Sequence, residues 1–300
     1  MKIMRFIGIV FALFSAGSPS DTSAQDSGKK YKVYMVSNSH LDTQWRWDVK
    51  ATIDDYLYNT AVQNLALLEK YPHYVFNFEG AVKYEWIKEY YPHLFERIRK
   101  FVADGRWNIS GASFEANDPN MPSSESFIRN ILLAQEFYKK EFGIKSKDMF
   151  LPDCFGFSQV MPTLGHHCGL IGFSTQKLSW RTEPLVGDSK TPFPIGLWEG
   201  VDGARIMVAL EPGRYSWNEF PEGDLSANEE LAESARKSPF GIAYRYYGNK
   251  LANGAGDHGG SALPRSIQLL EEGITNGKGP VQLVSATSSQ LYEDYMPYGN

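Results

Sequence analysis

The feature that most constrains the fold is an alternation of strand-like and helix-like segments that begins at Tyr31. The strand-like segments are short and rich in β-branched or aromatic residues. The helix-like segments carry apolar residues three or four positions apart, as in Ala61, Leu65 and Leu68. Because parallel strands joined by helical crossovers produce this alternation, the chain is predicted to be an α/β protein. Roughly seven units favour a complete or incomplete seven-stranded β/α barrel over an open sheet, although the pattern alone does not decide between them.

Individual elements can be placed from the same pattern. Strands are predicted at 33–36, 74–78, 107–110, 149–151, 171–174, 205–210 and 281–284, and helices at 53–71, 86–103, 124–142, 160–168, 227–237 and 265–273. The segment 181–203 is rich in Pro and Gly and is predicted to be irregular. Barrel enzymes carry their chemistry on the loops after the strands, so the site is expected on those loops.

The loop after the first strand carries a candidate metal site. His40 and Asp42 are separated by one residue, and residues i and i+2 of an extended chain point to the same face. An imidazole and a carboxylate are donors that zinc accepts. The alternative is that His40 satisfies local backbone groups while Asp42 caps the next helix.

Carboxylates recur on the later loops. Glu79 follows the second strand, Glu115 and Asp118 the third, Asp153 the fourth, and Asp257 lies between glycines further on. Cleavage of a glycosidic bond uses two carboxyl groups, one as nucleophile or base and one as proton donor. Each residue also has a structural alternative, because Asp often starts turns and tolerates positive φ.

The N-terminus carries a targeting pattern. A basic start and an apolar run at 6–16 are followed by small residues before Gln25. This predicts a signal peptide at 1–24, with an apolar run too short to span a bilayer. A polar linker at 25–30 would then lead into one domain at 31–300. The mature protein is expected to be secreted or periplasmic, with no membrane span.

Composition restricts the partners. The formal net charge is −5 and no basic stripe is present, which argues against a nucleic-acid partner. The aromatic content of 14% supplies faces that can stack on sugar rings. Cys154 and Cys168 are too few for a disulfide framework, and whether they pair is left open.

Five segments together carry a family resemblance. They are, in chain order, HLDTQW, GRWNISGASFEANDPNMPSSES, FLPDCFGFSQVMP, GFSTQKLSW and GAGDHGG. They resemble the catalytic domain of glycoside hydrolase family 38, the zinc-dependent retaining α-mannosidases, from about Tyr31 to the C-terminus. PD-x-FG and QKLSW are the most specific pieces. The resemblance implies a seven-stranded β/α barrel, a Zn²⁺ cofactor, and an α-mannose-containing oligosaccharide or glycan as the substrate.

The resemblance also implies roles for single residues. His40 and Asp42 match the first two zinc ligands of the family. Asp153 matches the carboxylate that both contacts zinc and attacks the anomeric carbon. The attack would give a covalent glycosyl-enzyme, as in other retaining glycosidases. Asp257 is the candidate general acid/base.

Two aromatic residues are expected at the sugar. Trp45 matches the family's aromatic residue that packs against the sugar beside the metal, with a core position as its alternative, and Trp47 is expected to be purely structural. Tyr215 is a candidate to line the sugar site. The segment 115–118 is expected to support the site or to cap the next helix.

The chain also departs from the family pattern. The fourth zinc ligand of the family is a His in a later motif, which would lie beyond Asn300, and His258 is the alternative within the chain. Helical and β-sandwich domains follow the barrel in the family, so we expect a C-terminally truncated catalytic domain. Two other functions stay open. A metal-dependent polysaccharide deacetylase would use a His-x-x-x-His pair, which the sequence lacks. An inactive, truncated glycan-binding remnant is the other.

Overall fold

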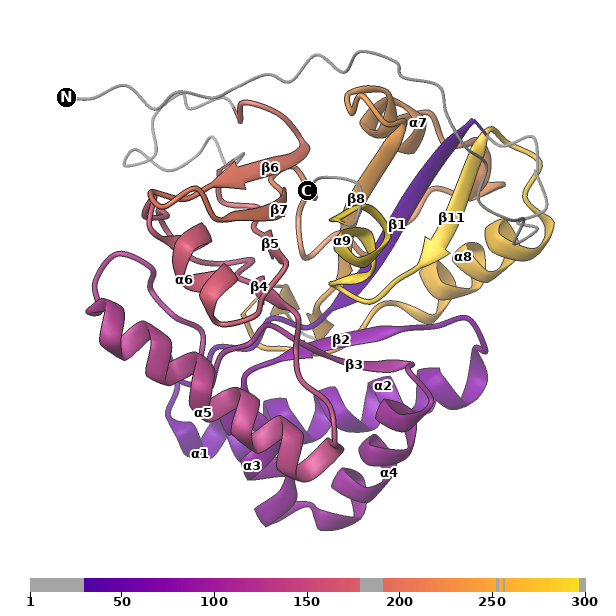
Figure 1. Cartoon of the computed structure of the whole chain (residues 1–300). Coiled ribbons are helices and arrows are strands. Elements are labelled where there is room, and N and C mark those ends of the chain that lie inside the picture. Colours follow the sequence, from indigo (N-terminus) through magenta and orange to yellow (C-terminus); the bar gives the residue numbers. More distant parts are fainter. Residues whose placement is uncertain (1–29, 179–190, 252–253, 256, 297–300) are drawn as a thin grey trace.

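The computed structural model describes residues 30–178, 191–251, 254–255 and 257–296 of the 300-residue chain. The predicted signal peptide and nearly all of the predicted linker lie outside the described residues. Within them the chain forms a mixed α/β fold with two main sheets, which confirms the predicted class (Figure 1). Lys250–Leu251 (β9) and Gly254–Ala255 (β10) add a short antiparallel pair.

The larger sheet is parallel and is centred on β1 (Tyr31–Asn38). Along one edge β1 pairs with β8 (Ile242–Gly248) from Lys32 to Asn38. Its other edge is shared by β11 (Val281–Ser285) and then β2 (Phe76–Glu79). β3 (Trp107–Ser110) pairs with β2. The end of β1 is therefore held on both sides, which fixes the loop that carries His40.

The second sheet has four strands. β4 (Asp148–Phe150), β5 (Gly172–Ser174) and β7 (Arg205–Ala209) are parallel, and β6 (Ile195–Glu199) runs antiparallel to β7. The prediction that 181–203 is irregular was therefore wrong for β6, where apolar side chains alternate along an edge strand. Strand pairing joins the strands into two sheets and not into one continuous ring, so the seven-stranded barrel is only partly confirmed.

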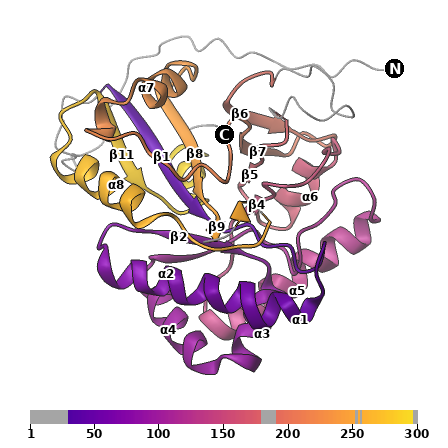
Figure 2. The same cartoon turned by 180° about the vertical axis from the view of Figure 1, so that it is seen from behind.

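Helices cover the outer faces of both sheets (Figures 1 and 2). α2 to α5 lie along β2 and β3, α6 lies beside β5 to β7, and α7 and α8 flank β8 and β11. The helical segments are α1 (Val49–Ala51), the π-helix η1 (Thr52–Leu57), α2 (Tyr58–Lys70), α3 (Ala81–Tyr90), α4 (Pro92–Ala103), α5 (Ser124–Phe142), α6 (Met161–His167), the 3₁₀-helix η2 (Leu225–Ala227), α7 (Glu229–Arg236), α8 (Pro264–Asn276) and α9 (Gln290–Tyr295).

Local sequence signals explain where several helices begin and end. α5 starts where the Ser123 side chain accepts a hydrogen bond from the Ser126 N–H, and it ends at Gly143, which is left-handed with φ 74°. Both boundaries match the prediction. The helix predicted over 86–103 is instead divided into α3 and α4 at Tyr91, which has φ −134° and ψ 56°. Pro92 causes the break because a residue before proline avoids the helical region.

Two apolar clusters follow from the alternation of side chains across the strands. Val33, Met35 and Tyr247 face the helices, in the cluster that also contains α2 to α4. Tyr34 and Tyr246 face the opposite way, into a cluster that the two sheets share. α9 packs Leu291 and Tyr292 into this second cluster, and its Asp294 hydrogen-bonds Lys32 and Tyr34 at the start of β1. This helix therefore covers the start of β1, at the opposite end of the strand from the loop that carries His40.

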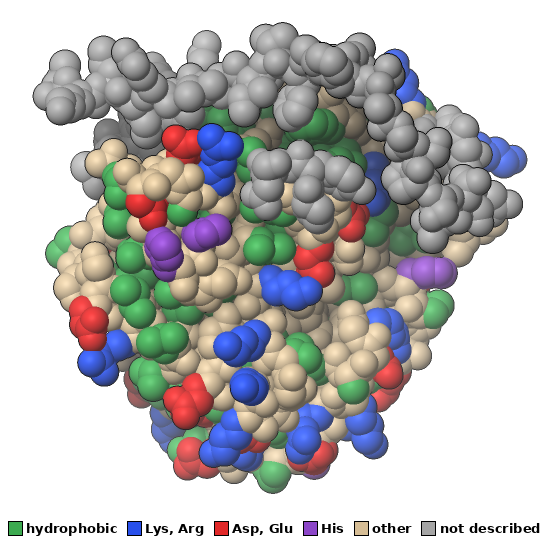
Figure 3. Space-filling model, in the orientation of Figure 1, with side chains coloured by type: hydrophobic (Ala, Val, Ile, Leu, Met, Phe, Trp, Pro, Cys, Tyr) green, Lys and Arg blue, Asp and Glu red, His purple; other side chains and the backbone are tan. Residues whose placement is uncertain are grey.

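The surface shows a mixed charge pattern. On the described part of the face in Figure 3, acidic and basic side chains are interspersed. None of the helices in the described ranges is both long enough and apolar enough to cross a membrane.

A buried carboxyl group lies where the two sheets meet. Asp148 at the start of β4 is fully buried, and its Oδ1 accepts hydrogen bonds from the Gly111 N–H at 3.1 Å and the Ser146 hydroxyl at 3.2 Å. Burial raises the pKa of Asp148 from 3.8 to about 6, although hydrogen bonds from Ser288, Gly111 and Ser146 oppose the rise. The protonated form is therefore the one that favours the folded state.

This shift predicts a pH-dependent free energy of unfolding. The contribution of protonated Asp148 is fully present below pH 4 and is lost as the pH rises through about 6. Asp148→Asn removes the titration. The free energy of unfolding of the variant, relative to that of wild type, should therefore increase by up to about 3 kcal/mol as the pH is raised from 4 to 8. Urea unfolding at both pH values measures this change. Parallel profiles for the two proteins would contradict the shift.

Candidate active site

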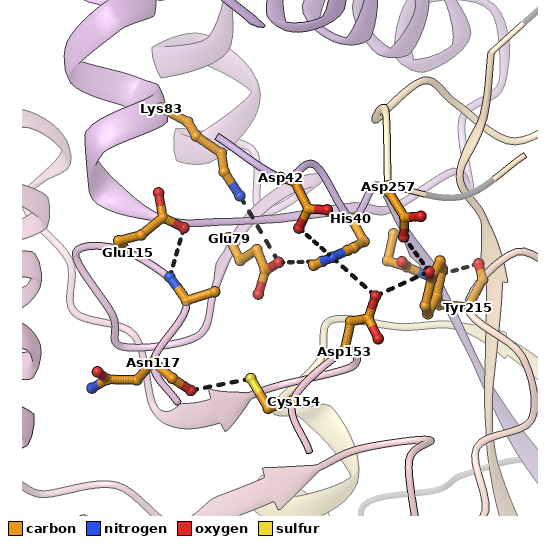
Figure 4. Close-up of polar contacts among 12 residues, drawn as sticks. His40, Asp42, Glu79, Lys83, Glu115, Asn117, Asp153, Cys154, Tyr215 and Asp257 are labelled. Carbon is orange, nitrogen blue, oxygen red and sulfur yellow. Dashed lines mark hydrogen bonds and ion pairs between the residues drawn. The ribbon is translucent and has the colours of Figure 1, made fainter. Parts of the chain in front are cut away.

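Four predicted site residues converge at the carboxyl ends of the strands. His40 and Asp42 follow β1, Asp153 follows β4, and Asp257 lies beyond β10. Figure 4 shows His40 with Asp42 and Asp153 on one side and Glu79 on the other, and Tyr215 between Asp153 and Asp257. The fold therefore brings together side chains that are far apart in the sequence. His40 and Asp257, for example, are separated by 217 positions.

His40 is the centre of the cluster. Its side chain is 5% exposed, and its Nδ1 lies 3.0 Å from Glu79 Oε1 at the end of β2. Its Nε2 lies 3.2 Å from Asp42 Oδ1 and 3.5 Å from Asp153 Oδ2, but it makes no hydrogen bond to any of the described residues. The Glu79 contact fixes the orientation of the ring and leaves Nε2 directed at the two aspartates, an arrangement typical of histidines that bind metals.

The cluster favours positive charge at its centre. Burial alone would lower the pKa of His40, but the close carboxylates of Asp42 and Glu79, together with the charge of Asp153, raise it from 6.5 to about 10. Three carboxylates thus surround one buried imidazole. An acidic environment of this kind suits a divalent cation as well as a proton.

Three groups at the site have the spacing of metal ligands. One donor atom from each of His40, Asp42 and Asp257 lies within 4.8 Å of the others. One nitrogen and two oxygen donors are a ligand set that zinc accepts. The Nε2 atom of His40, which is buried and has no hydrogen bond, supplies the donor that such an ion needs. The residues therefore fit a zinc ion. Asp257, which was expected to act only as the acid/base, stands in this group in place of the predicted ligand Asp153, whose Oδ2 lies 3.5 Å from His40 Nε2.

Asp153 is held by two other side chains. Lys177, which follows β5 and is 4% exposed, forms an ion pair with Asp153 Oδ1. The Tyr215 hydroxyl lies 3.3 Å from Asp153 Oδ2 and 2.6 Å from Asp257 Oδ1. Burial, followed by the charges of both aspartates, raises the pKa of Tyr215 far above its usual value, so the hydroxyl stays protonated. Having one proton, it can donate to only one of the two carboxylates at a time.

The loops of His40 and Asp257 are joined by backbone hydrogen bonds. The Asp42 N–H donates to Asp257 O at 2.9 Å, and the Gly259 N–H donates to His40 O at 2.9 Å. Leu41 and His258 form an isolated β-bridge between these bonds. Asp257 has φ 50° and Gly259 has φ 75°, where an added Cβ would meet Thr60 Oγ1 at 2.4 Å. Glycine is therefore required there, and the two loops form one unit.

The aromatic predictions divide as follows. Trp45 is 52% exposed, so the core alternative does not apply. Its ring has the Arg46 guanidinium carbon 4.1 Å from its centre and the Trp47 ring 6.1 Å away. Trp47 stacks on His258, with ring centroids 4.3 Å apart, and donates its indole N–H to Thr52. Trp47 therefore has the packing role that was expected. The His258 ring lies in that stack and outside the metal-competent group of described residues.

The loop that follows β3 has a supporting role. Asn117 O accepts a hydrogen bond from Cys154 Sγ at 3.1 Å, and Asp118 accepts from the backbone N–H of Asn120 at 2.8 Å. The first contact ties this loop to the residue that follows Asp153, and the second shapes the loop itself. Cys154 and Cys168 are free thiols.

Two residues of the site were not assigned from the sequence. Glu79 was noted only as a loop residue, and Lys177 only as part of the QKLSW segment. Glu79 is the last residue of β2 and Lys177 lies three residues after β5, and such positions at the carboxyl ends of strands are the signal that could have identified them. The contacts of Glu79 with His40 and of Lys177 with Asp153 could not be predicted from local spacing, because each contact depends on which strands are neighbours in the sheet.

Comparison with known proteins adds independent information. Residues 30–295 match the model of the glycosyl hydrolases family 38 N-terminal domain. The chain is 31% identical over 276 residues to alpha-mannosidase G of Dictyostelium discoideum, a match that covers 92% of this chain and 24% of that protein. It is 32% identical over 265 residues to human alpha-mannosidase 2C1, covering 88% of this chain and 24% of the relative. The chain thus spans about a quarter of the length of these relatives.

Solved structures share the fold. An alpha-mannosidase from Enterococcus faecalis superposes with a TM-score of 0.69 at 23% identity, over 90% of this chain and 29% of that chain. A Mycobacterium smegmatis protein assigned as a polysaccharide deacetylase gives a TM-score of 0.55 at 14% identity, over 94% of this chain and 96% of the other. At these identities the structures support the fold alone.

Proposed function

Because the chain belongs to glycosyl hydrolase family 38 over residues 30–295, we propose that it is a zinc-dependent α-mannosidase that cleaves glycans with retention of configuration. The observation that carries the proposal is the convergence of His40, Asp42, Asp153 and Asp257 at the strand ends. The relatives named above are alpha-mannosidases, which supports the choice of mannose.

In this proposal His40, Asp42 and Asp153 would hold the zinc ion. An oxygen of Asp257 lies within 4.8 Å of donor atoms of His40 and Asp42, so this carboxylate would be close to the reaction centre. Bound zinc would act as a Lewis acid that orients vicinal sugar hydroxyls and favours charge development at the anomeric carbon. Glu79 fixes the ring of His40 from behind. The exposed face of Trp45 packs against the sugar.

The protein groups divide the chemistry between them. Asp153 attacks the anomeric carbon, and Lys177 and Tyr215 keep its carboxylate in position. Asp257 donates a proton to the leaving oxygen and then takes one from the water that releases the sugar. Both aspartates lie within hydrogen-bonding reach of one phenol oxygen, which suits the separation of about 5–5.5 Å that retaining enzymes use.

The bridging hydroxyl gives a testable role for Tyr215. Tyr215→Phe removes a hydrogen bond to a carboxylate, which is worth about 1.5–3 kcal/mol, so kcat should fall about 10- to 100-fold. Because either aspartate loses its donor, the pH profile of kcat should shift as well. The exposed Tyr90→Phe is the matched control and should behave like wild type. An unchanged kcat and pH profile in Tyr215→Phe would remove this residue from the mechanism.

The function is tested by substrate choice and product stereochemistry. An aryl α-mannoside should be hydrolysed, and nuclear magnetic resonance should show the α-anomer of mannose as the first product. The β-anomer as the first product would exclude a covalent intermediate on Asp153. Release of acetate from an acetylated chitin-like substrate would support the deacetylase instead, in keeping with the shared fold. If neither reaction occurs, the chain is a glycan-binding remnant.

We further propose that the two sheets form one seven-stranded barrel of β8, β1, β2, β3, β4, β5 and β7. The support is a backbone hydrogen bond at each seam, from the Ala112 N–H to Asp148 O at 2.9 Å and from the Tyr246 N–H to Pro212 O at 2.8 Å. Slow amide exchange at Ala112 and Tyr246 would agree with closure, and rapid exchange would contradict it.

Export is likewise a proposal. It rests on the basic and apolar pattern of residues 1–24, which predicts cleavage before Gln25. N-terminal sequencing of the protein recovered from outside the cytoplasm should begin at Gln25.

A further inference from the structure

A second cavity lies outside the cluster of catalytic candidates. It has a volume of about 510 Å³, and none of His40, Asp42, Asp153 or Asp257 lines it. Its walls come from the loop after β7, from α7 and from β8; the residues used below are Arg214, Trp217, Glu219, Glu230, Arg245 and Asn249. A volume of this size falls in the range of small-molecule sites.

The cavity opens on the outer side of β8. Tyr244 and Tyr246 of β8 face the cluster between the two sheets, so Arg245 faces the helices with Ala243 and Tyr247. The loop after β7 is tied to this strand, because the Gly248 N–H donates to Trp217 O at 2.9 Å. Tyr215, on the same loop, directs its hydroxyl to the catalytic aspartates. The loop therefore separates two sites.

One wall residue carries polar groups that the described residues do not satisfy. Asn249 is fully buried, and neither Oδ1 nor Nδ2 has a hydrogen-bond partner in that part of the chain. Each such group costs about 1–3 kcal/mol when it is left unpaired. The backbone of Asn249 has φ 57°, and its N–H donates to Asn38 O at 3.0 Å, so the residue is held in place. A carboxamide offers both donors and an acceptor, which is what a hydroxyl group pairs with.

The other walls set the chemical class of the ligand. Trp217 is half-buried: the Phe220 ring centroid lies 4.6 Å and the Arg245 guanidinium carbon 5.2 Å from the centre of its ring, so only the remaining exposed part of the indole faces the cavity. Arg245 is itself paired with Glu230 at 2.7 Å. Arg214 and Glu219 add one charge of each sign, so the lining carries no net formal charge. An aromatic surface, a free carboxamide and balanced charges favour a neutral ligand rich in hydroxyl groups over an anion or a cation.

We propose that this cavity is a second saccharide site, which binds a neutral pyranose unit independently of the zinc cluster. Trp217 supplies the surface for the sugar ring, and Asn249 supplies the hydrogen bonds to its hydroxyls. The inference does not depend on catalysis, because the pocket shares no residue with the proposed reaction.

The test uses the whole chain after treatment with a chelator, so that the zinc site does not contribute. Methyl α-mannoside, methyl α-glucoside and methyl β-N-acetylglucosaminide are titrated and followed by nuclear magnetic resonance. At least one glycoside should bind with 1:1 stoichiometry, and its identity assigns the sugar. Asn249→Gly keeps the positive φ and removes the carboxamide, so it should weaken binding about tenfold or more. Asn276→Gly, at an exposed position, is the matched control and should leave binding unchanged.

Four results would overturn the proposal. They are the absence of chelator-resistant binding by all three glycosides, unchanged binding in Asn249→Gly, equal loss in Asn276→Gly, and displacement of the sugar by inorganic phosphate. Thermal unfolding of Asn249→Gly shows that a loss of binding is not a loss of fold. A protein that binds the glycoside but hydrolyses no mannoside would contradict the mannosidase proposal and leave the second site intact.

Discussion

Asp153→Ala is expected to reduce hydrolysis of an aryl α-mannoside by a factor on the order of 10³ or more, because the variant lacks the attacking carboxylate. The carboxylate sits between Lys177 and Tyr215, beside the Nε2 atom of His40. No other described carboxylate has this set of contacts, so no neighbour can replace it. The exposed Asp104→Ala should retain wild-type rates and serves as the matched control.

Chemical rescue separates a nucleophile from a merely structural residue. Removal of the Asp153 side chain opens space in which azide can approach the anomeric carbon. Azide should restore part of the activity of Asp153→Ala and yield a mannosyl azide of inverted configuration, because only one displacement then occurs. Full activity without azide would remove Asp153 from the mechanism. An absence of rescue, together with lost zinc, would assign it to metal binding alone.

Removal of zinc is expected to have an effect of similar size. A Lewis acid at the sugar supplies several kcal/mol of transition-state stabilisation, so chelation should lower kcat/KM by about 10²- to 10⁴-fold. Added Zn²⁺ should restore wild type. It should not restore His40→Ala, because this variant lacks the buried Nε2 atom that faces Asp42 and Asp153.

Metal content gives an independent measure of the same prediction. Elemental analysis should find about one zinc per wild-type chain and much less in His40→Ala. The exposed His93→Ala should bind zinc normally. Full turnover by wild-type protein that contains no metal would contradict zinc dependence, even if Asp153 proved essential.

Alternation of apolar residues, helix caps and terminal glycines correctly predicted the strands and helices in which these local signals all favour the same structure. β3 and α5 match the prediction to the residue, because the strand alternates apolar and polar residues and the helix has a serine cap and a terminal glycine. β8 was missed, although it is the longest partner of β1. Its Arg245 interrupts the apolar run, since this side chain faces α7 and not the core, and only the tyrosines at alternate positions mark the strand.

The sequence indicated candidate site residues on individual loops, but not which of these residues contact one another. Positions after predicted strands indicated His40, Asp42 and Asp153 as candidates, and the family resemblance added Asp257 and assigned the roles. The structure brings the four side chains close together. The pairing of His40 with Glu79 depends on β1 and β2 being neighbours, and the pairing of Asp153 with Lys177 depends on β4 and β5. Those contacts arise from the order of strands in the sheets, which the sequence pattern does not contain.

The backbone ladder between the His40 loop and the Asp257 loop has a consequence for protein engineering. A substitution that repositions Asp257, the proposed proton donor, also moves the backbone that positions Asp42, so we expect that affinity for the proposed metal and choice of leaving group cannot be tuned separately. Directed evolution toward new aglycones would have to alter both loops in concert, and single changes in either should show strong epistasis with the other.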